Sequence, residues 1–327
     1  MTEPADGINS APATAASSAP EVIAIVGATA TGKSAISVGI AEHLIARGTP
    51  AEIINGDSMQ FYRGMDIGSA KLPMAQRRGI VHHLLDTLDV SQDATVAQFQ
   101  DQARAAIDDI HARGGRAIVV GGSGLYLRAL LDKFDFPPTD PQVREKFETR
   151  AEVEGPGVLY RELLAVDPDA ASKIQPQNAK RIARALEVIE ITGEKFSSSL
   201  PVKEYAIPAV QVGLRVPYEI LDARIDARVE HMWAAGLVDE VRRLEEQGIR
   251  GAITARRAVG YAETLSHLDG QLTERQTIDL IAQHTRRLAR KQHRWFGPDD
   301  RVNWVDGPVD TDDVPRAVAD AIRAAGL

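Results

Sequence analysis

The residues from Gly27 to Ser34 have the types and the spacing of a phosphate-binding loop, G-x-x-x-x-G-K-[ST]. The loop consists of Gly27, Ala28, Thr29, Ala30, Thr31, Gly32, Lys33 and Ser34. In such a loop, backbone N–H groups, the start of the following helix and the lysine all present positive charge to one small volume. This arrangement serves to bind a phosphate or a diphosphate, although the pattern alone does not identify the compound.

Asp57 is a carboxylate placed to meet a reactant bound at this loop. It follows a strand expected at residues 51–55, and ligands of open parallel sheets gather at the carboxyl ends of the strands. A carboxylate there can act as a general base, or it can hold Mg²⁺ together with the Ser34 hydroxyl. The simpler interpretation is an aspartate that caps a turn.

The strand expected at residues 116–120 ends without an acidic residue. It continues into Gly121, Gly122, Ser123 and Gly124, and the next carboxylate is Asp132. A P-loop ATPase or GTPase is expected to have Asp or Glu here to hold magnesium. This argues against a motor or switch protein. It leaves open a small-metabolite kinase with ATP in the loop and Asp57 as base.

Strands and helices alternate around these residues. Strands are expected at residues 21–26, 51–55, 116–120 and 211–216, with a last short strand at 302–305. Helices are expected at 35–47, 95–113, from 125 onward and 273–296, and one or two helices at 222–247. The alternation predicts an α/β fold, a P-loop parallel sheet with helices on both faces. Because residues 140–192 carry only helical signals, we predict a helical insertion domain at 137–205 that interrupts a catalytic core at 21–136 and 206–327.

Composition narrows the classes of protein to consider. The chain of 327 residues has no cysteine and a net charge of −8, which excludes disulfides and thiolate zinc sites and argues against a generic nucleic-acid binder. Its apolar runs are too short for a membrane span. Residues 1–20 are rich in Ala, Ser, Pro and Thr and predict a disordered tail rather than a secretory signal. We therefore expect a cytoplasmic protein.

Basic residues gather at three places in this acidic chain: 180–184, 256–257 and 286–294. Each cluster alone is typical of a solvated helix face. Three of them together predict a partner that carries many phosphates.

The ordered set of motifs resembles the tRNA dimethylallyltransferase family, over residues 23 to about 305. Beside the loop, the matching segments are Asp57–Gln60, Tyr62–Lys71, His82–Asp86, Val120–Tyr126, Arg181–Glu187, Arg228–Val241, Arg257–Tyr261 and Thr285–Trp295. Many families share the loop, but the ordered set is specific to this family.

The resemblance implies transfer of a dimethylallyl group from dimethylallyl diphosphate to N6 of adenosine 37 in a tRNA anticodon loop, without ATP hydrolysis. The diphosphate is expected on the loop with Lys33, Ser34 and Mg²⁺, and Asp57 is expected to remove the N6 proton. Ser123 matches a position that is usually threonine in the family, with its hydroxyl at the reacting centre. Arg228 matches an arginine that contacts the diphosphate; a surface arginine is the alternative.

The resemblance also implies which residues contact the flipped nucleotide and the anticodon stem-loop. They are Asp57, Ser58, Met59, Gln60, Ser123, Arg144, Lys180, Arg181, Ile182, Ala183, Arg184, Arg257, Ala258, Val259, Gly260, Tyr261 and Ala262. Ala262 departs from the family, because many relatives carry a basic residue there. The cluster at 286–294 either faces the tRNA or packs on the core through its arginine stems. We expect a monomer, and the residues that line a prenyl pocket are not identified at this stage.

Two other functions remain open. The kinase explains the loop, Ser34 and Asp57, but it does not explain the downstream motifs or the basic clusters. A non-catalytic tRNA- or nucleotide-binding protein needs the basic clusters but has no need of Asp57.

Overall fold

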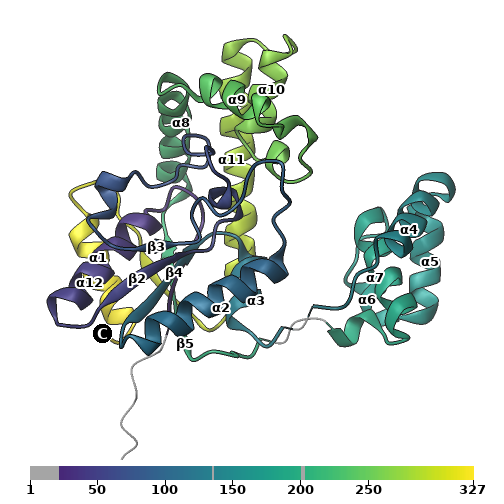
Figure 1. Ribbon diagram of the computed structural model, residues 1–327, viewed down its shortest axis with the longest axis horizontal. Coiled ribbons are helices and arrows are strands. Elements are labelled where there is room, and N and C mark those ends of the chain that lie inside the picture. The colour runs from purple at the N-terminus through teal and green to yellow at the C-terminus, as the bar shows by residue number, and fades with distance from the viewer. Residues whose placement is uncertain (1–21, 135, 200–202) are drawn as a thin grey trace, which may run out of the picture.

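The computed structural model describes residues 22–134, 136–199 and 203–327. Its centre is a parallel sheet with the strand order β3-β2-β4-β1-β5-β6 (Figure 1). The strands are β1 (Val22–Gly27), β2 (Ala51–Asn55), β3 (His82–His83), β4 (Arg116–Gly121), β5 (Ala209–Arg215) and β6 (Val302–Asp306). The phosphate loop therefore follows a central strand, with β4 on one side and β5 on the other.

Helices account for most of the remaining described residues. They are α1 (Lys33–Ala46), α2 (Val96–Ala112), α3 (Gly124–Leu131), α4 (Pro141–Glu154), α5 (Pro156–Val166), α6 (Pro168–Ser172), α7 (Ala179–Thr192), α8 (Tyr218–Ala234), α9 (Leu237–Glu246), α10 (Tyr261–Leu268), α11 (Glu274–Phe296) and α12 (Val314–Ala324). None of the helices in the described ranges combines the length and the apolar character that crossing a membrane requires.

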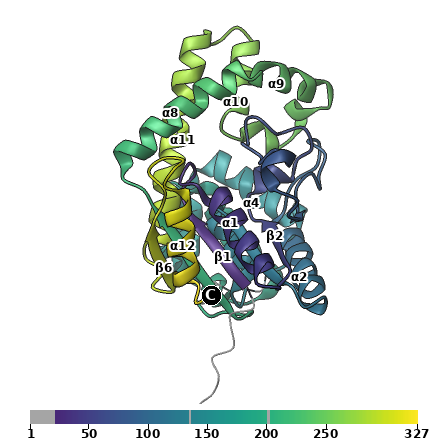
Figure 2. The same ribbon diagram turned by 90° about the vertical axis from the view of Figure 1, so that its left-hand side faces the viewer.

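Strand β1 is buried on both faces, as its continuous apolar run predicts. Val22, Ala24 and Val26 pack in one core with α2 and α3, while Ile23 and Ile25 pack in another with α1 and α12. Successive side chains of a strand point to opposite faces, so one strand serves both cores. In Figure 2, α1 and α12 lie in front of the strands. The predicted α/β fold with helices on both faces is confirmed.

Helices α8 to α11 form a third core above the sheet, together with Tyr62 and Met65 from the segment after β2 (Figure 2). Helix α11 joins this core to the sheet, because Ala289 belongs to the upper core and Phe296 to the core of α2 and α3. This upper group holds α8 and α11 over the loop that follows β1.

Helices α4 to α7 lie apart from the sheet and have a core of their own (Figure 1). The side chain of Glu187 is fully buried in this group and accepts hydrogen bonds from Thr139 Oγ1, the Asp140 N–H and Arg144. Burial opposes ionisation, but the bonds from Thr139, Arg184 and Arg144 outweigh it and lower the pKa of Glu187. The breaks between α4, α5, α6 and α7 lie at the glycines and prolines, as the sequence predicted. The domain limits at 137 and 205 stay a prediction.

Three elements escaped the sequence analysis: β3, α10 and α12. β3 has two residues, too few for an alternating pattern. α12 follows an acidic stretch, but Ala317 and Ala321 pack it against α1. Of the one or two helices expected at 222–247, the structure has two, because Gly236 adopts φ 99° between α8 and α9. The predicted tail at 1–20 lies outside the described residues.

The buried carboxylate of Glu240 ties the segment after β2 to the upper group. It accepts hydrogen bonds from the N–H groups of Asp66, Ile67 and Gly68 at 3.1, 2.7 and 3.2 Å. It also accepts one from the Tyr261 hydroxyl at 2.7 Å. Burial and this carboxylate raise the pKa of Tyr261 well above its usual range. One side chain of α9 therefore connects α10 with the segment after β2, and both of these line the site described below.

We predict that Glu240→Ala lowers the free energy of unfolding by about 3 kcal/mol, because it leaves three N–H groups and a hydroxyl unpaired. The neighbouring Asp239 is exposed and pairs only with Arg242 among the described residues, so Asp239→Ala serves as the control, with an effect below about 0.5 kcal/mol. Urea denaturation measures both variants. Equal midpoints for the two would contradict this role of Glu240.

Candidate active site

The phosphate loop connects β1 to α1 in a conformation that requires small residues. Gly27, Ala30 and Gly32 have φ angles of 139°, 63° and 90°, which residues with a side chain rarely adopt. The Thr31 hydroxyl is buried and donates to the carbonyl of Ala28 at 2.8 Å. These contacts fix the loop at the start of α1, where the N–H groups of a helix terminus are available to an anion.

Two cations and one carboxylate meet at the loop. Lys33 Nζ donates to the carbonyl of Ala28 at 2.6 Å. Removal from water lowers the pKa of Lys33 to about 8, while Asp57 acts to raise it and Arg228 to lower it. Desolvation also lowers the pKa of Arg228, whose Nη1 lies 3.4 Å from Thr29 Oγ1. An anion bound here would therefore be attracted by charges that water screens poorly.

Asp57 lies opposite these cations. Its Oδ1 accepts from the N–H of Met59 at 3.0 Å, so it caps a short 3₁₀ helix, Ser58–Phe61, as the simpler interpretation predicted. Asn55 fixes the backbone around it, with its amide and carbonyl bonded to the Asp57 C=O and N–H at 3.0 Å each. Desolvation raises the pKa of Asp57 against the effects of the Met59 bond and of Lys33. Capping therefore positions the carboxylate without excluding a role in chemistry.

Two adjoining cavities share a wall at these residues. The first has a volume of about 400 Å³ and is lined by the loop, Asn55, Gln60 and Arg224 among others. The second measures about 300 Å³. Thr29, Asp57, Ser69 and Arg228 line both. The carboxylate and Arg228 thus stand between a polar cavity over the phosphate loop and a second cavity with a different lining.

The wall of the second cavity includes apolar side chains of α8. Ile225, Val229 and Met232 line it at the i, i+4 and i+7 positions of the helix, with Arg228 between them. The sequence analysis missed these three residues, although their spacing on one face was a usable signal. It also missed Arg224, one turn before Arg228, whose guanidinium donates to the carbonyl of Pro308 at 2.5 Å.

Helix α11 touches the phosphate loop through Gln292. Its Oε1 accepts from the N–H of Thr29 at 2.8 Å. Its amide packs so closely on Gly122 that a Cβ there would lie 2.4 Å from Nε2, which explains the glycine after β4. Gln292 lies in the family-matching segment Thr285–Trp295, but no local pattern distinguishes it from a surface glutamine, so the sequence analysis did not assign it to the site.

The predicted tRNA-contacting residues of the core gather at these cavities. Those that line the second cavity are Asp57, Ser58, Met59, Ser123, Arg257, Ala258, Val259 and Tyr261. Gln60 lines the first cavity. Gly260 and Ala262 are the sequence neighbours of Tyr261, but they line neither cavity.

The predicted contacts at the insertion lie elsewhere, on α4 and α7, and line neither cavity. Arg144 and Arg184 bind the buried Glu187. The side chains of Ile182 and Ala183 have no exposed surface, because they belong to the core of that group. The expectation that these two side chains contact RNA is therefore corrected. Lys180 and Arg181 are exposed, and their role stays a prediction.

Ser34 and Asp57 both line the first cavity and offer oxygen donors, which is the ligand type that Mg²⁺ prefers. Within the described ranges, no group of three or more His, Cys, Asp or Glu is arranged to hold a metal ion. Mg²⁺ is usually bound by one or two protein groups, waters and substrate phosphates. Ser34 and Asp57 fit a Mg²⁺ ion whose other ligands would be waters and the oxygens of a bound diphosphate.

The chain is similar to known proteins over most of its length. The family model described as IPP transferase matches residues 60–299. A tRNA dimethylallyltransferase from Kineococcus radiotolerans is 54% identical over 93% of this chain and 97% of its own length. One from Thermobifida fusca is also 54% identical, over 91% of this chain and 93% of its own length.

Two solved structures are similar over most of the chain. The tRNA isopentenylpyrophosphate transferase from Bacillus halodurans has a TM-score of 0.67 at 36% identity and covers 94% of this chain and 97% of its own. A eukaryotic dimethylallyltransferase, described as acting on tRNA, has a TM-score of 0.77 at 30% identity over 91% of this chain and 77% of its own. These tRNA dimethylallyltransferases are similar to this chain along nearly its whole length. The chain therefore belongs to the IPP transferase family.

Proposed function

We propose that the two cavities hold the two substrates of dimethylallyl transfer to tRNA. The diphosphate of dimethylallyl diphosphate lies on the phosphate loop, and adenosine 37 of an anticodon loop enters the second cavity. The observation that carries this assignment is the position of Asp57 and Arg228 on the wall between the cavities. The relatives are named for prenyl transfer to tRNA, which supports this reaction and not the kinase.

The loop side serves the leaving group. As the allylic C–O bond breaks, negative charge grows on the diphosphate, and the loop N–H groups, Lys33 and Arg228 stabilise it there. Mg²⁺ held by Ser34 and Asp57 would supply further positive charge to the same oxygens. Lys33 and Arg228 belong to the folded protein, so their electrostatic stabilisation of the diphosphate is in place before the reaction begins.

The other side serves the nucleophile. The adenine N6 attacks the allylic carbon, and its proton passes to the Asp57 carboxylate. A carboxylate within hydrogen-bond reach of N6 suits a weakly nucleophilic aromatic amine, because proton removal has to accompany or follow the attack. Ser123 lines the same cavity and can hydrogen-bond at the reacting centre. Unstacking an adenine costs less in a loop than in a duplex.

The apolar wall of α8 suits the prenyl chain. Ile225, Val229 and Met232 lie beside Arg228, next to the position of the diphosphate. Burial of five carbons is worth about 4 kcal/mol, enough to favour dimethylallyl diphosphate over bare diphosphate. The cytoplasmic location and the monomeric state stay predictions.

We predict that Asp57→Asn lowers kcat for prenyl transfer by about 10²- to 10⁴-fold, because the amide cannot accept the N6 proton. The amide oxygen can still cap Met59, so binding of tRNA should change little. Asp89→Asn, an exposed carboxylate, is the control. The assay digests the tRNA and quantifies the prenylated nucleoside. Phosphorylation of a metabolite by ATP without transfer to tRNA would overturn the assignment in favour of the kinase.

We also predict that the affinity for the donor falls as pH rises through about 8. The pKa of Lys33 is lowered to about 8, so the ammonium that attracts the diphosphate is present below that pH and is lost above it. Binding of the anion raises this pKa, so complex formation takes up protons. Calorimetry from about pH 7 to about pH 9.5 measures the effect. Lys33→Arg keeps its charge and should flatten the profile; an equally steep decline in that variant would contradict the role of Lys33.

A further inference from the structure

The second cavity runs between helices α8 and α11, and each helix lines it with one face. The lining side chains of the two helices are, from α8, Ile225, Arg228, Val229 and Met232 and, from α11, Ile281, Thr285, Leu288 and Gln292. The helices are antiparallel, because Arg290 pairs with Asp222 at 2.6 Å and Arg286 pairs with Asp226. The cavity therefore has one end at the phosphate loop and another end farther along both helices.

The end of the cavity at the phosphate loop is polar. Gln292 accepts a hydrogen bond from the N–H of Thr29, and Arg228 Nη1 lies 3.4 Å from Thr29 Oγ1. Of the two cavities, Arg224 lines the first, Arg228 lines both, and Met232 lines the second. These three residues are each one helical turn apart on α8. Within two turns, the wall of α8 thus changes from the diphosphate side to an apolar side chain.

The far end of the cavity is closed by two buried apolar side chains. Met232 is 8% exposed and Ile281 is 2% exposed, and both belong to the upper core. Because Asp226 faces Arg286, Met232 at six residues after Asp226 lies opposite the turn that holds Ile281. Helix α8 ends at Ala234, so no further turn of it prolongs the cavity.

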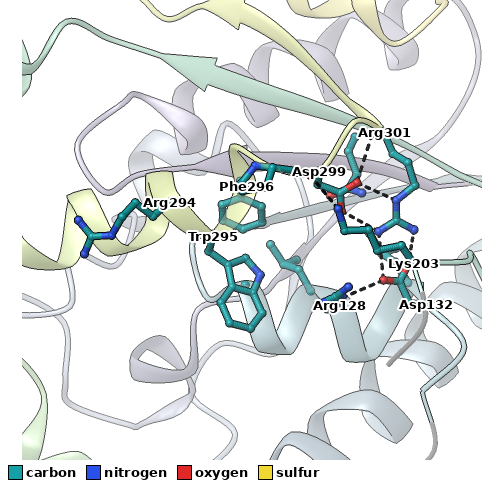
Figure 3. A pocket seen from close by; sticks show the side chains of 13 residues that line it. Arg128, Asp132, Lys203, Arg294, Trp295, Phe296, Asp299 and Arg301 are labelled. Carbon is teal, nitrogen blue, oxygen red and sulfur yellow. Dashed lines mark hydrogen bonds and ion pairs between the residues drawn. The ribbon is translucent and has the colours of Figure 1, made fainter. Parts of the chain in front are cut away.

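Helix α11 is anchored at its carboxyl end, which fixes its place beside α8. The indole of Trp295 packs on Gly124, where a Cβ would lie 2.0 Å from Cδ1. In Figure 3 the indole points from α11 toward α3, beside Arg128. Phe296 is buried in the core of α2 and α3. Together with the two ion pairs to α8, these contacts hold Ile281 in place at the closed end.

The separation of Arg228 and Met232 suits a short prenyl chain. One helical turn lies between them, which is a rise of about 6 Å. The longest carbon path of a dimethylallyl group spans about 4 Å, whereas that of a ten-carbon geranyl group spans about 9 Å, at ~1.5 Å for each bond. The shorter chain ends before Met232 and the longer one reaches past it.

We propose that Met232, backed by Ile281, is the end wall of the prenyl site and restricts the donor to an allylic diphosphate of five carbons. The inference rests on the proposed function and deepens it, because it assigns the selection of donor length to one side chain. Met232 touches the apolar tail and takes no part in the bonds that form and break.

The wild-type enzyme tests the closed end without any substitution. In an open apolar channel, geranyl diphosphate would bind more tightly than dimethylallyl diphosphate, because it buries more CH₂ groups. Against an end wall the longer chain is overpacked, so it should bind about 10-fold more weakly. Competition between the two diphosphates for the wild type measures this ratio. Equal or tighter binding of geranyl diphosphate would overturn the inference.

Met232→Ala should open the wall and allow geranyl transfer to tRNA. The N6–carbon bond forms as the allylic C–O bond breaks, diphosphate leaves, and the N6 proton passes to Asp57, as with the shorter donor. The ratio of kcat/KM for geranyl over dimethylallyl diphosphate should rise about 10- to 200-fold. Mass spectrometry of the digested tRNA distinguishes the two products.

Two matched variants control for the substitution itself. Met232→Leu nearly conserves the volume of the side chain, so it should keep the donor ratio of the wild type. Met74→Ala makes the same change at a methionine that is 75% exposed and lines neither cavity. It should also leave the ratio unchanged.

The outcomes separate this inference from the proposed function. If Met232→Ala is folded by its thermal midpoint and keeps the donor ratio of the wild type, the inference is overturned and the function stands. A higher KM for tRNA with an unchanged donor ratio would assign Met232 to the adenosine and overturn it too. If Met232→Ala does not fold, the competition with the wild type decides. A wild type that transfers no dimethylallyl group to tRNA overturns the proposed function itself.

Discussion

The site depends on placing Lys33, Asp57 and Arg228 beside one another where they are partly buried. A single charge in such a place is costly, and here one carboxylate faces two cations, so one positive charge remains uncompensated. Burial lowers the pKa values of both cations, while Asp57 acts to raise them. A bound diphosphate compensates the remaining positive charge. The same electrostatic imbalance that costs stability in the free protein therefore provides affinity for the anion and stabilises it as it leaves.

Three distant parts of the chain have to converge to produce this arrangement. Lys33 follows β1, Asp57 follows β2, and Arg228 comes from α8 after the helical insertion. The parallel sheet brings the first two together, because both strands end at one edge. Arg228 depends on the upper core and on α11, whose Gln292 reaches the loop. Glu240 then fixes the segment after β2 against the same helices. The upper group is thus a structural requirement of the phosphate site.

The sequence predicts those parts that local patterns encode. The glycine spacing of the loop, the apolar runs of β1 and β4 and the family motifs indicate the fold and place Asp57 correctly. It does not predict contacts made across the fold. In the sequence, Gln292 and Trp295 look like ordinary surface residues. In the structure, Gln292 accepts a hydrogen bond from Thr29 and Trp295 packs on Gly124. From the sequence, Arg144 likewise has no evident partner, whereas in the structure it forms an ion pair with Glu187 of α7. Contacts of this kind depend on how distant segments pack together, which cannot be read from a single sequence.

The root of the helical insertion has a consequence for how the chain folds. The Lys133 N–H bonds the carbonyl of Glu204 at 2.8 Å, and the Ala206 N–H bonds that of Leu131 at 2.7 Å. The two ends of the insertion are therefore held side by side at the spacing of paired strands, about 5 Å. Strand β5 has to find β1, some 190 residues earlier in the chain. An insertion that is already closed at its root shortens the effective loop and lowers the entropy cost of that encounter.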